Sequence, residues 1–85
     1  MTEFTYEIKD NLGIHARPAG LLVKTASDFK SQITLIKEEK QTDAKKLFGV
    51  MGLNVKVDDK VTVRIDGEDE EEAKETLLKF FGENL

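Results

Sequence analysis

Residues 13–29 read GIHARPAGLLVKTASDF, a stretch that begins as a loop and continues as a helix. Gly13 permits a tight turn, and Pro18 fits the first turn of a helix, where its missing backbone N–H costs nothing. From Leu21 to Phe29, apolar side chains recur at helical spacing. We therefore expect a loop and then a helix here, between segments of a different periodicity.

The flanking segments alternate apolar with polar residues, which is typical of half-buried strands. The alternating apolar positions are Phe4, Tyr6 and Ile8, then Ile33 and Leu35, and then Val61, Val63 and Ile65. We expect a further short strand at residues 40–42, a short helix at residues 45–52 and a final helix after Asp69. Asp69 and Glu72 resemble a capping box at the start of that helix, and Gly82 can close it.

This order of elements predicts an α+β fold, an open-faced β-sandwich of βαββαβα order. Strands that alternate cleanly favour an antiparallel sheet with one wet face, so the helices must cover the other face. We expect a four-stranded antiparallel sheet covered on one face by three helices. At 85 residues the chain is predicted to form a single domain over residues 1–85.

Composition narrows the classes of function. The chain has no cysteine and carries a net charge of −4, with an excess of acidic residues in residues 61–85. No basic stripe with interleaved aromatic residues is present, so we expect no nucleic-acid binding. No apolar run is long enough for membrane insertion, and the acidic, alternating N-terminus is unlike a signal peptide. We therefore expect a cytoplasmic protein.

The short middle helix carries more apolar residues than one side of a helix can bury. Leu47, Phe48, Val50 and Met51 cover most of its circumference. We expect Leu47 and Phe48 to be exposed, and an exposed apolar cluster beside basic residues indicates a partner-binding surface. The alternative is that a loop buries this helix.

His15 is the only histidine of the chain, and it lies just before the predicted helix. The N-terminus of a helix attracts anions, and Arg17 adds a donor suited to phosphate oxygens. The segment can therefore hold a phosphate beside a nucleophilic nitrogen. The sequence offers no second group to activate water, since Glu7 and Asp10 have no evident role, and one histidine cannot make a metal site. We predict a carrier of phosphoryl groups that is not an enzyme and needs no cofactor or metal.

The chain resembles the HPr family, the histidine-containing phosphocarriers of the bacterial phosphoenolpyruvate-dependent sugar phosphotransferase system. The motifs that carry the resemblance are GIHARPAG at residues 13–20 and KKLFGVMGL at residues 45–53. The resemblance implies that His15 accepts a phosphoryl group from enzyme I, through its Nδ1 atom, and donates it to sugar-specific IIA domains. It also implies that Arg17, with backbone groups of the segment Ala16–Pro18, binds the phosphoryl group.

The resemblance further implies one docking face for both partners of a chain that we expect to be a monomer. Its residues would be Ala16, Gly20, Lys24, Lys45, Lys46, Leu47, Phe48 and Met51. Two positions depart from the family pattern. Many members carry a serine that a dedicated kinase phosphorylates where this chain has Lys46, and many carry a larger residue where it has Gly20.

The sequence is also compatible with two other functions. The first is a related protein in a regulatory branch, for example a nitrogen-related one, or an interaction module whose function lies in binding. The second is an amino-acid-binding regulatory domain of similar element order, which is usually a dimer.

Overall fold

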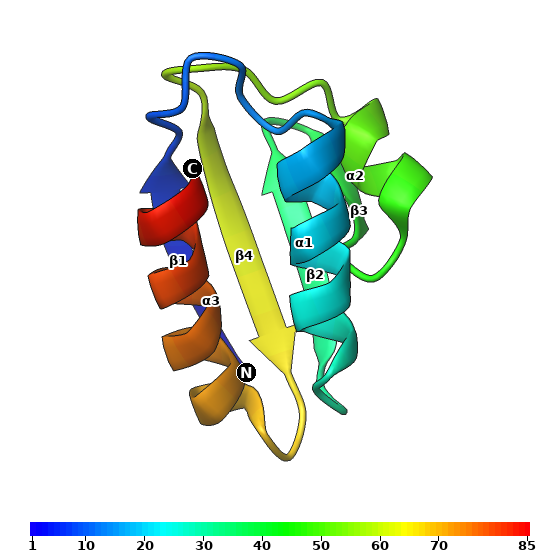
Figure 1. Ribbon diagram of the computed structural model, residues 1–85. Helices are drawn as coiled ribbons and strands as arrows, with labels where there is room; N and C mark the ends of the chain where they lie inside the picture. The colour runs from blue at the N-terminus through cyan, green and yellow to red at the C-terminus, as the bar shows by residue number, and fades with distance from the viewer.

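The computed structural model describes residues 1–85. It contains four strands, β1 (Thr2–Glu7), β2 (Gln32–Lys37), β3 (Lys40–Asp43) and β4 (Lys60–Asp66). Its three helices are α1 (Ala16–Ser27), α2 (Leu47–Gly52) and α3 (Glu70–Asn84). The βαββαβα order is the predicted one (Figure 1).

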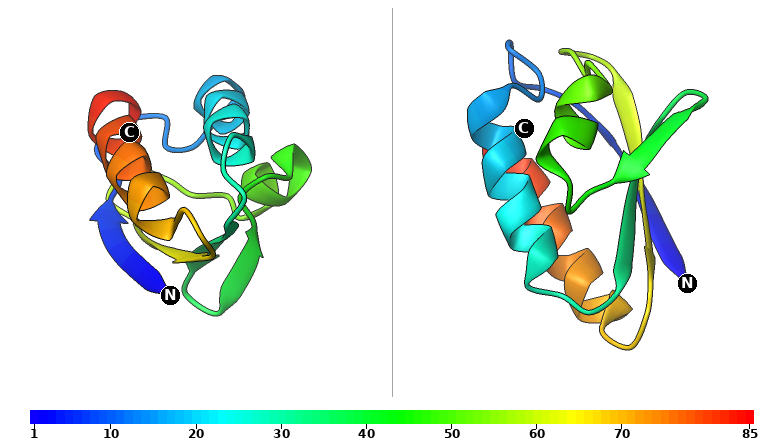
Figure 2. Two further views of the ribbon diagram at one scale, coloured as in Figure 1. Left: turned by 90° about the horizontal axis from the view of Figure 1, so that it is seen from below. Right: turned by 90° about the vertical axis from the view of Figure 1, so that its right-hand side faces the viewer.

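The strands form one antiparallel sheet in the order β1-β4-β2-β3. β4 therefore pairs with both β1 and β2, with Phe4 and Leu35 both opposite Val63. All three helices lie on one face of this sheet, which the view along the strands shows most clearly (Figure 2). The opposite face is uncovered, so the predicted open-faced sandwich is confirmed.

The core lies between the sheet and the helices. The inward positions of β2 and β4, among them Ile33, Leu35 and Val63, are almost wholly buried. Phe81 of α3 is also fully buried, and its ring meets the rings of Phe4 and Tyr6 edge to face at centroid distances of 5.7 and 5.4 Å. Edge-to-face pairs add to the stability that burial provides, so these contacts attach α3 to the edge strand β1.

The start of α3 differs from the predicted capping box. Asp69 stands at the N-cap, but its side chain makes no capping hydrogen bond. Its carboxylate instead accepts hydrogen bonds from the backbone N–H groups of Lys30 and Ser31, at 2.8 and 2.9 Å, and from the Ser31 hydroxyl at 2.5 Å. These bonds hold the pKa of Asp69 at about 2, below its usual 3.8. Asp69 thus connects α3 to the turn between α1 and β2.

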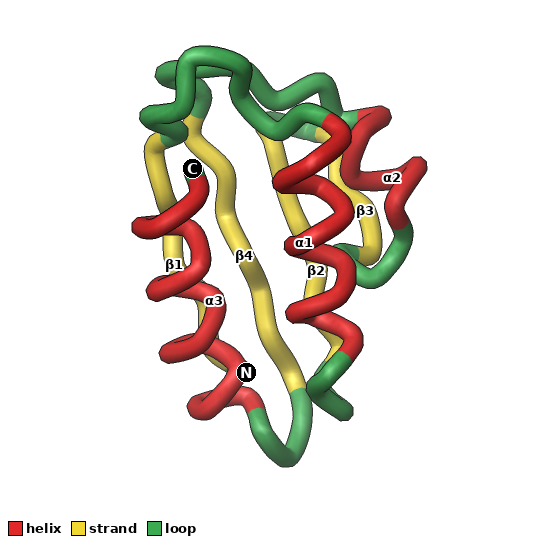
Figure 3. Tube along the Cα trace, viewed as in Figure 1, coloured by secondary structure: helices red, strands yellow, loops and turns green.

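Gly82 does not close α3, because the helix continues to Asn84. Beyond it, the backbone oxygen of Leu85 accepts hydrogen bonds from the N–H groups of Lys9 and Asp10, at 2.5 and 2.7 Å. The chain after β1 is therefore held against the end of α3. The loops that follow β1 and precede β4 lie together at the same end of the molecule (Figure 3).

Candidate functional site

His15 is the N-cap residue of α1, with extended backbone angles of φ −99° and ψ −173°. Its carbonyl oxygen accepts the first helical hydrogen bond, from the N–H of Ala19 at 2.9 Å. Its side chain makes no capping bond and is half-buried. The backbone N–H groups of Ala16 and Arg17 have no acceptor within the helix. The imidazole therefore stands beside two free N–H donors and the positive end of a helix.

The loop before His15 is held by the loop before β4. Gly13 has a positive φ of 66°, and a Cβ atom there would lie 2.3 Å from the carbonyl oxygen of Val55. That same oxygen accepts a hydrogen bond of 3.0 Å from the N–H of Ile14. Only glycine allows the two loops to approach this closely. The position of His15 thus depends on residues forty positions further along the chain.

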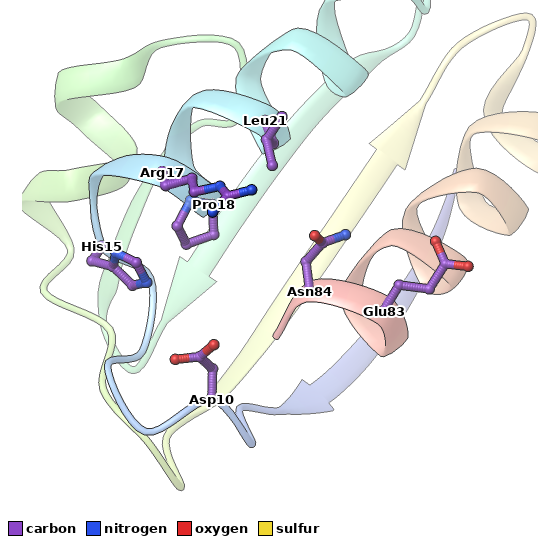
Figure 4. Close-up of a pocket in the computed structure, with 7 residues that line it drawn as sticks. All are labelled: Asp10, His15, Arg17, Pro18, Leu21, Glu83 and Asn84. Carbon is purple, nitrogen blue, oxygen red and sulfur yellow. The ribbon is translucent and has the colours of Figure 1, made fainter.

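A depression of about 230 Å³ lies beside His15. Its lining comes from three segments, the loop after β1, the first turns of α1 and the last turn of α3 (Figure 4). The lining residues are Asp10, His15, Arg17, Pro18, Leu21, Glu83 and Asn84. Arg17 is exposed and takes part in none of the ion pairs of the structure. Its guanidinium is therefore available to an anion.

Sequence reasoning missed several of these lining residues. Leu21 is one of the apolar residues that recur at helical spacing, yet it is 40% exposed and lies one helical turn after Arg17 on the same side. The spacing of Leu21 from Arg17 is therefore a signal in the sequence that places Leu21 beside the site. Glu83 and Asn84 reach the site only through the packing of α3, and no local pattern in the sequence points to them.

The predicted docking residues lie on α1, on α2 and in the loop before α2, and the two helices are in contact. Six of them are exposed, namely Ala16, Lys24, Lys46, Leu47, Phe48 and Met51, while Gly20 and Lys45 are half-buried. Phe48 is 87% exposed, in contrast to Val50 of the same helix, which is fully buried. The expected exposure of Leu47 and Phe48 is therefore confirmed, and the alternative of a buried helix is not.

Lys45 has a contact that the sequence did not indicate. Its Nζ atom donates a hydrogen bond of 2.7 Å to the carbonyl oxygen of Phe29, just beyond the end of α1. A cation near a helix C-terminus is favourable, because the helix dipole is negative there. The ammonium of Lys45 is thus already engaged within the protein, whereas Lys24 and Lys46 form no ion pair.

The structure contains no cluster of three or more metal-binding side chains. None of its helices has the length and apolar character needed to cross a membrane.

The chain is similar to known proteins both in sequence and in structure. The family model described as "PTS HPr component phosphorylation site" matches residues 2–83. Phosphocarrier protein HPr of Mycoplasma capricolum is 40% identical over 82 residues, which cover 92% of each chain. The crystal structure of HPr-C-His from Thermoanaerobacter tengcongensis is 46% identical, covers 100% of each chain and has a TM-score of 0.90. Crh of Bacillus subtilis, solved as a dimer with a swapped domain, is 38% identical over 100% of this chain and 98% of its own, with a TM-score of 0.78.

Proposed function

Because the chain belongs to the HPr family of the bacterial phosphotransferase system, whose members are phosphocarriers and not catalytic enzymes, we propose that His15 is its phosphorylation site. His15 accepts a phosphoryl group from phosphorylated enzyme I and passes it to sugar-specific IIA domains during phosphoenolpyruvate-dependent sugar uptake. The exchange takes place in the cytoplasm, and the carrier acts as a monomer. The observation that carries this proposal is the free imidazole of His15 at the N-terminus of α1.

The transfer exchanges one bond to phosphorus for another. The bond between phosphorus and the donor atom breaks as a bond forms to the Nδ1 atom of His15, and the ring releases its proton. The new phosphoryl group carries roughly −1.5 to −2 charges. The N–H groups of Ala16 and Arg17, the helix dipole and the Arg17 guanidinium offset this charge. Pro18, which has no N–H, leaves these two amides as the donors of the first turn.

Docking rests on the exposed apolar residues of α2 and their basic neighbours. Leu47, Phe48 and Met51 offer apolar area, and Lys24 and Lys46 offer positive charge toward acidic partners. Since one face serves donor and acceptor, the two complexes exclude each other. A small apolar patch with steering charges favours rapid exchange over long-lived binding.

Incubation with phosphoenolpyruvate and purified enzyme I tests this function. We expect the wild-type protein to gain the mass of one phosphoryl group, which acid then removes, and His15→Ala to gain none. Ser27→Ala is the matched control, since it removes an exposed hydroxyl at the far end of α1 and should be labelled normally. Absence of a mass increase in the wild type, or an acid-stable one in His15→Ala, would contradict the proposal.

A second candidate is a regulatory function, which the similarity to Crh, described as a catabolite repression protein of Bacillus subtilis, favours, while Lys46 places the chain outside control by a serine kinase. Lys46 is exposed at the N-cap of α2 and has no hydroxyl for a serine kinase. Comparing the rates at which enzyme I of a sugar branch and enzyme I of a nitrogen branch phosphorylate this protein separates the two functions. Faster phosphorylation by the nitrogen-branch enzyme would favour the regulatory function.

A further inference from the structure

Asp10 lines the depression beside His15 although no sequence pattern assigns it a role. We propose that its carboxylate raises the phosphoryl-transfer potential of His15, which makes the phosphorylated carrier a better donor. This inference rests on the proposed phosphorylation of His15. It adds a residue that lies outside the GIHARPAG motif and that acts on the phosphoryl group through charge.

Asp10 is held firmly at this place. Its backbone N–H donates to the backbone oxygen of Leu85 at 2.7 Å, and its carbonyl oxygen accepts from the N–H of Gly13 at 2.9 Å. One carboxylate oxygen, Oδ1, accepts a hydrogen bond of 2.8 Å from the N–H of Leu12. These bonds leave Oδ2 without a partner in the protein. The carboxylate points into the space between His15 and Asn84 (Figure 4).

The carboxylate forms no ion pair that would neutralise it. Among the lining residues Arg17 is the only permanent cation, while Asp10 and Glu83 are both anions. Glu83 lies across the depression on α3, at its far edge (Figure 4). A phosphoryl group on His15 would therefore share the depression with the positive charge of Arg17 and the negative charge of Asp10, while Glu83 points away from His15 (Figure 4). Asp10, which comes just before the His15 loop, contributes the negative charge that is fixed in direction.

Repulsion between Asp10 and the phosphoryl group raises the free energy of the phosphorylated state alone. The unphosphorylated ring carries no negative charge, so the carboxylate does not disfavour it. Both groups line one depression of about 230 Å³, and salt screens charges that face solvent over a Debye length of roughly 8 Å at physiological ionic strength. We expect removal of this charge to shift the phosphorylation equilibrium about two- to tenfold toward the phosphorylated carrier at low salt.

The test measures that equilibrium with enzyme I, phosphoenolpyruvate and excess pyruvate at fixed ratios, reading the phosphorylated fraction by intact-protein mass. Asp10→Asn removes the charge but keeps a side-chain oxygen for the N–H of Leu12. Asp10→Glu keeps the charge. Asp28→Asn is the matched control, because Asp28 caps the opposite end of α1 and its loss changes the net charge equally. The measurements are made at low salt and repeated near 1 M salt.

We expect Asp10→Asn to favour the phosphorylated form, and Asp10→Glu and Asp28→Asn to match the wild type. The shift should disappear near 1 M salt, where the Debye length falls to about 3 Å. Equal equilibrium constants for wild type and Asp10→Asn would overturn the role of Asp10. So would an equal shift in Asp10→Glu or Asp28→Asn, or a shift that high salt leaves unchanged. A wild-type protein that takes up no phosphoryl group would instead contradict the proposed function itself.

Discussion

The substitution Phe48→Ala separates docking from folding, because the ring of Phe48 is 87% exposed. A phenylalanine side chain has roughly 200 Å² of accessible surface, so about 13% of it, some 25 Å², is buried. At about 25 cal/mol per Å² this burial stabilises the protein by about 0.6 kcal/mol. Alanine is the better helix former by up to about 0.7 kcal/mol, which offsets the loss. The free energy of unfolding should therefore change by less than about 0.5 kcal/mol.

Docking should respond far more strongly. A central aromatic residue that a partner buries contributes about 2 kcal/mol or more to binding, which corresponds to roughly 30-fold in affinity. We expect Phe48→Ala to raise KM for the carrier in phosphorylation by enzyme I by about that factor. The assay combines these kinetics with thermal unfolding, in which Tm should move by less than about 4 °C.

Phe81→Ala is the matched control, because Phe81 is fully buried. Its loss should cost about 3–5 kcal/mol of stability. If Phe48→Ala destabilises the fold by more than about 2 kcal/mol, the ring belongs to the core. If its KM equals that of the wild type, α2 is not the docking element.

Three further changes test the site and its support. Arg17→Ala should slow phosphoryl transfer at least tenfold with Tm unchanged, as measured by rapid-quench kinetics and thermal unfolding, because its guanidinium makes no ion pair in the fold. Asp69 has a folded pKa of about 2 against 3.8 for its ordinary value, so the unfolded state binds more protons between these values. The free energy of unfolding should fall as pH drops through this window. Asp69→Asn should reduce this pH dependence, as measured by denaturant unfolding. Gly13→Ala should cost more than about 1 kcal/mol in urea unfolding, because the new methyl group meets Val55, whereas Gly82→Ala in open helix should stabilise by about 0.5–1 kcal/mol.

The elements of the fold could be predicted because each one follows a local pattern. Alternation over Val61, Val63 and Ile65 marks a strand whichever partner it finds, and all three residues are buried. The capping box failed for the opposite reason. The carboxylate of Asp69 accepts a hydrogen bond from the hydroxyl of Ser31, 38 positions away in the sequence. Spacing within one helix cannot reveal such a partner. Gly82 likewise stays helical where a local signal indicated an end.

The residues of the site likewise divide into those that a local sequence pattern indicates and those that only the tertiary fold brings together. His15 and Arg17 were identified from one short motif, and Phe48 from the excess of apolar residues in a short helix. These three are candidates that the proposed experiments test. Asp10 and Asn84 share the depression with His15 and Arg17 only because α3 returns to the loop after β1. That approach is a property of the tertiary fold, and a single sequence carries no local sign of it.

The place of β4 in the sheet has a consequence for biosynthesis. β1 and β2 both pair with β4, and Thr2 lies opposite Ile65. A chain that emerges from the ribosome N-terminus first therefore makes β1 long before it makes the strand that β1 needs. Contacts so distant in sequence slow folding, since a large loop must close before they form. The sheet, and with it the loop contacts that position His15, must wait until residues 60–66 are free, so the site can form only after this strand has left the ribosome.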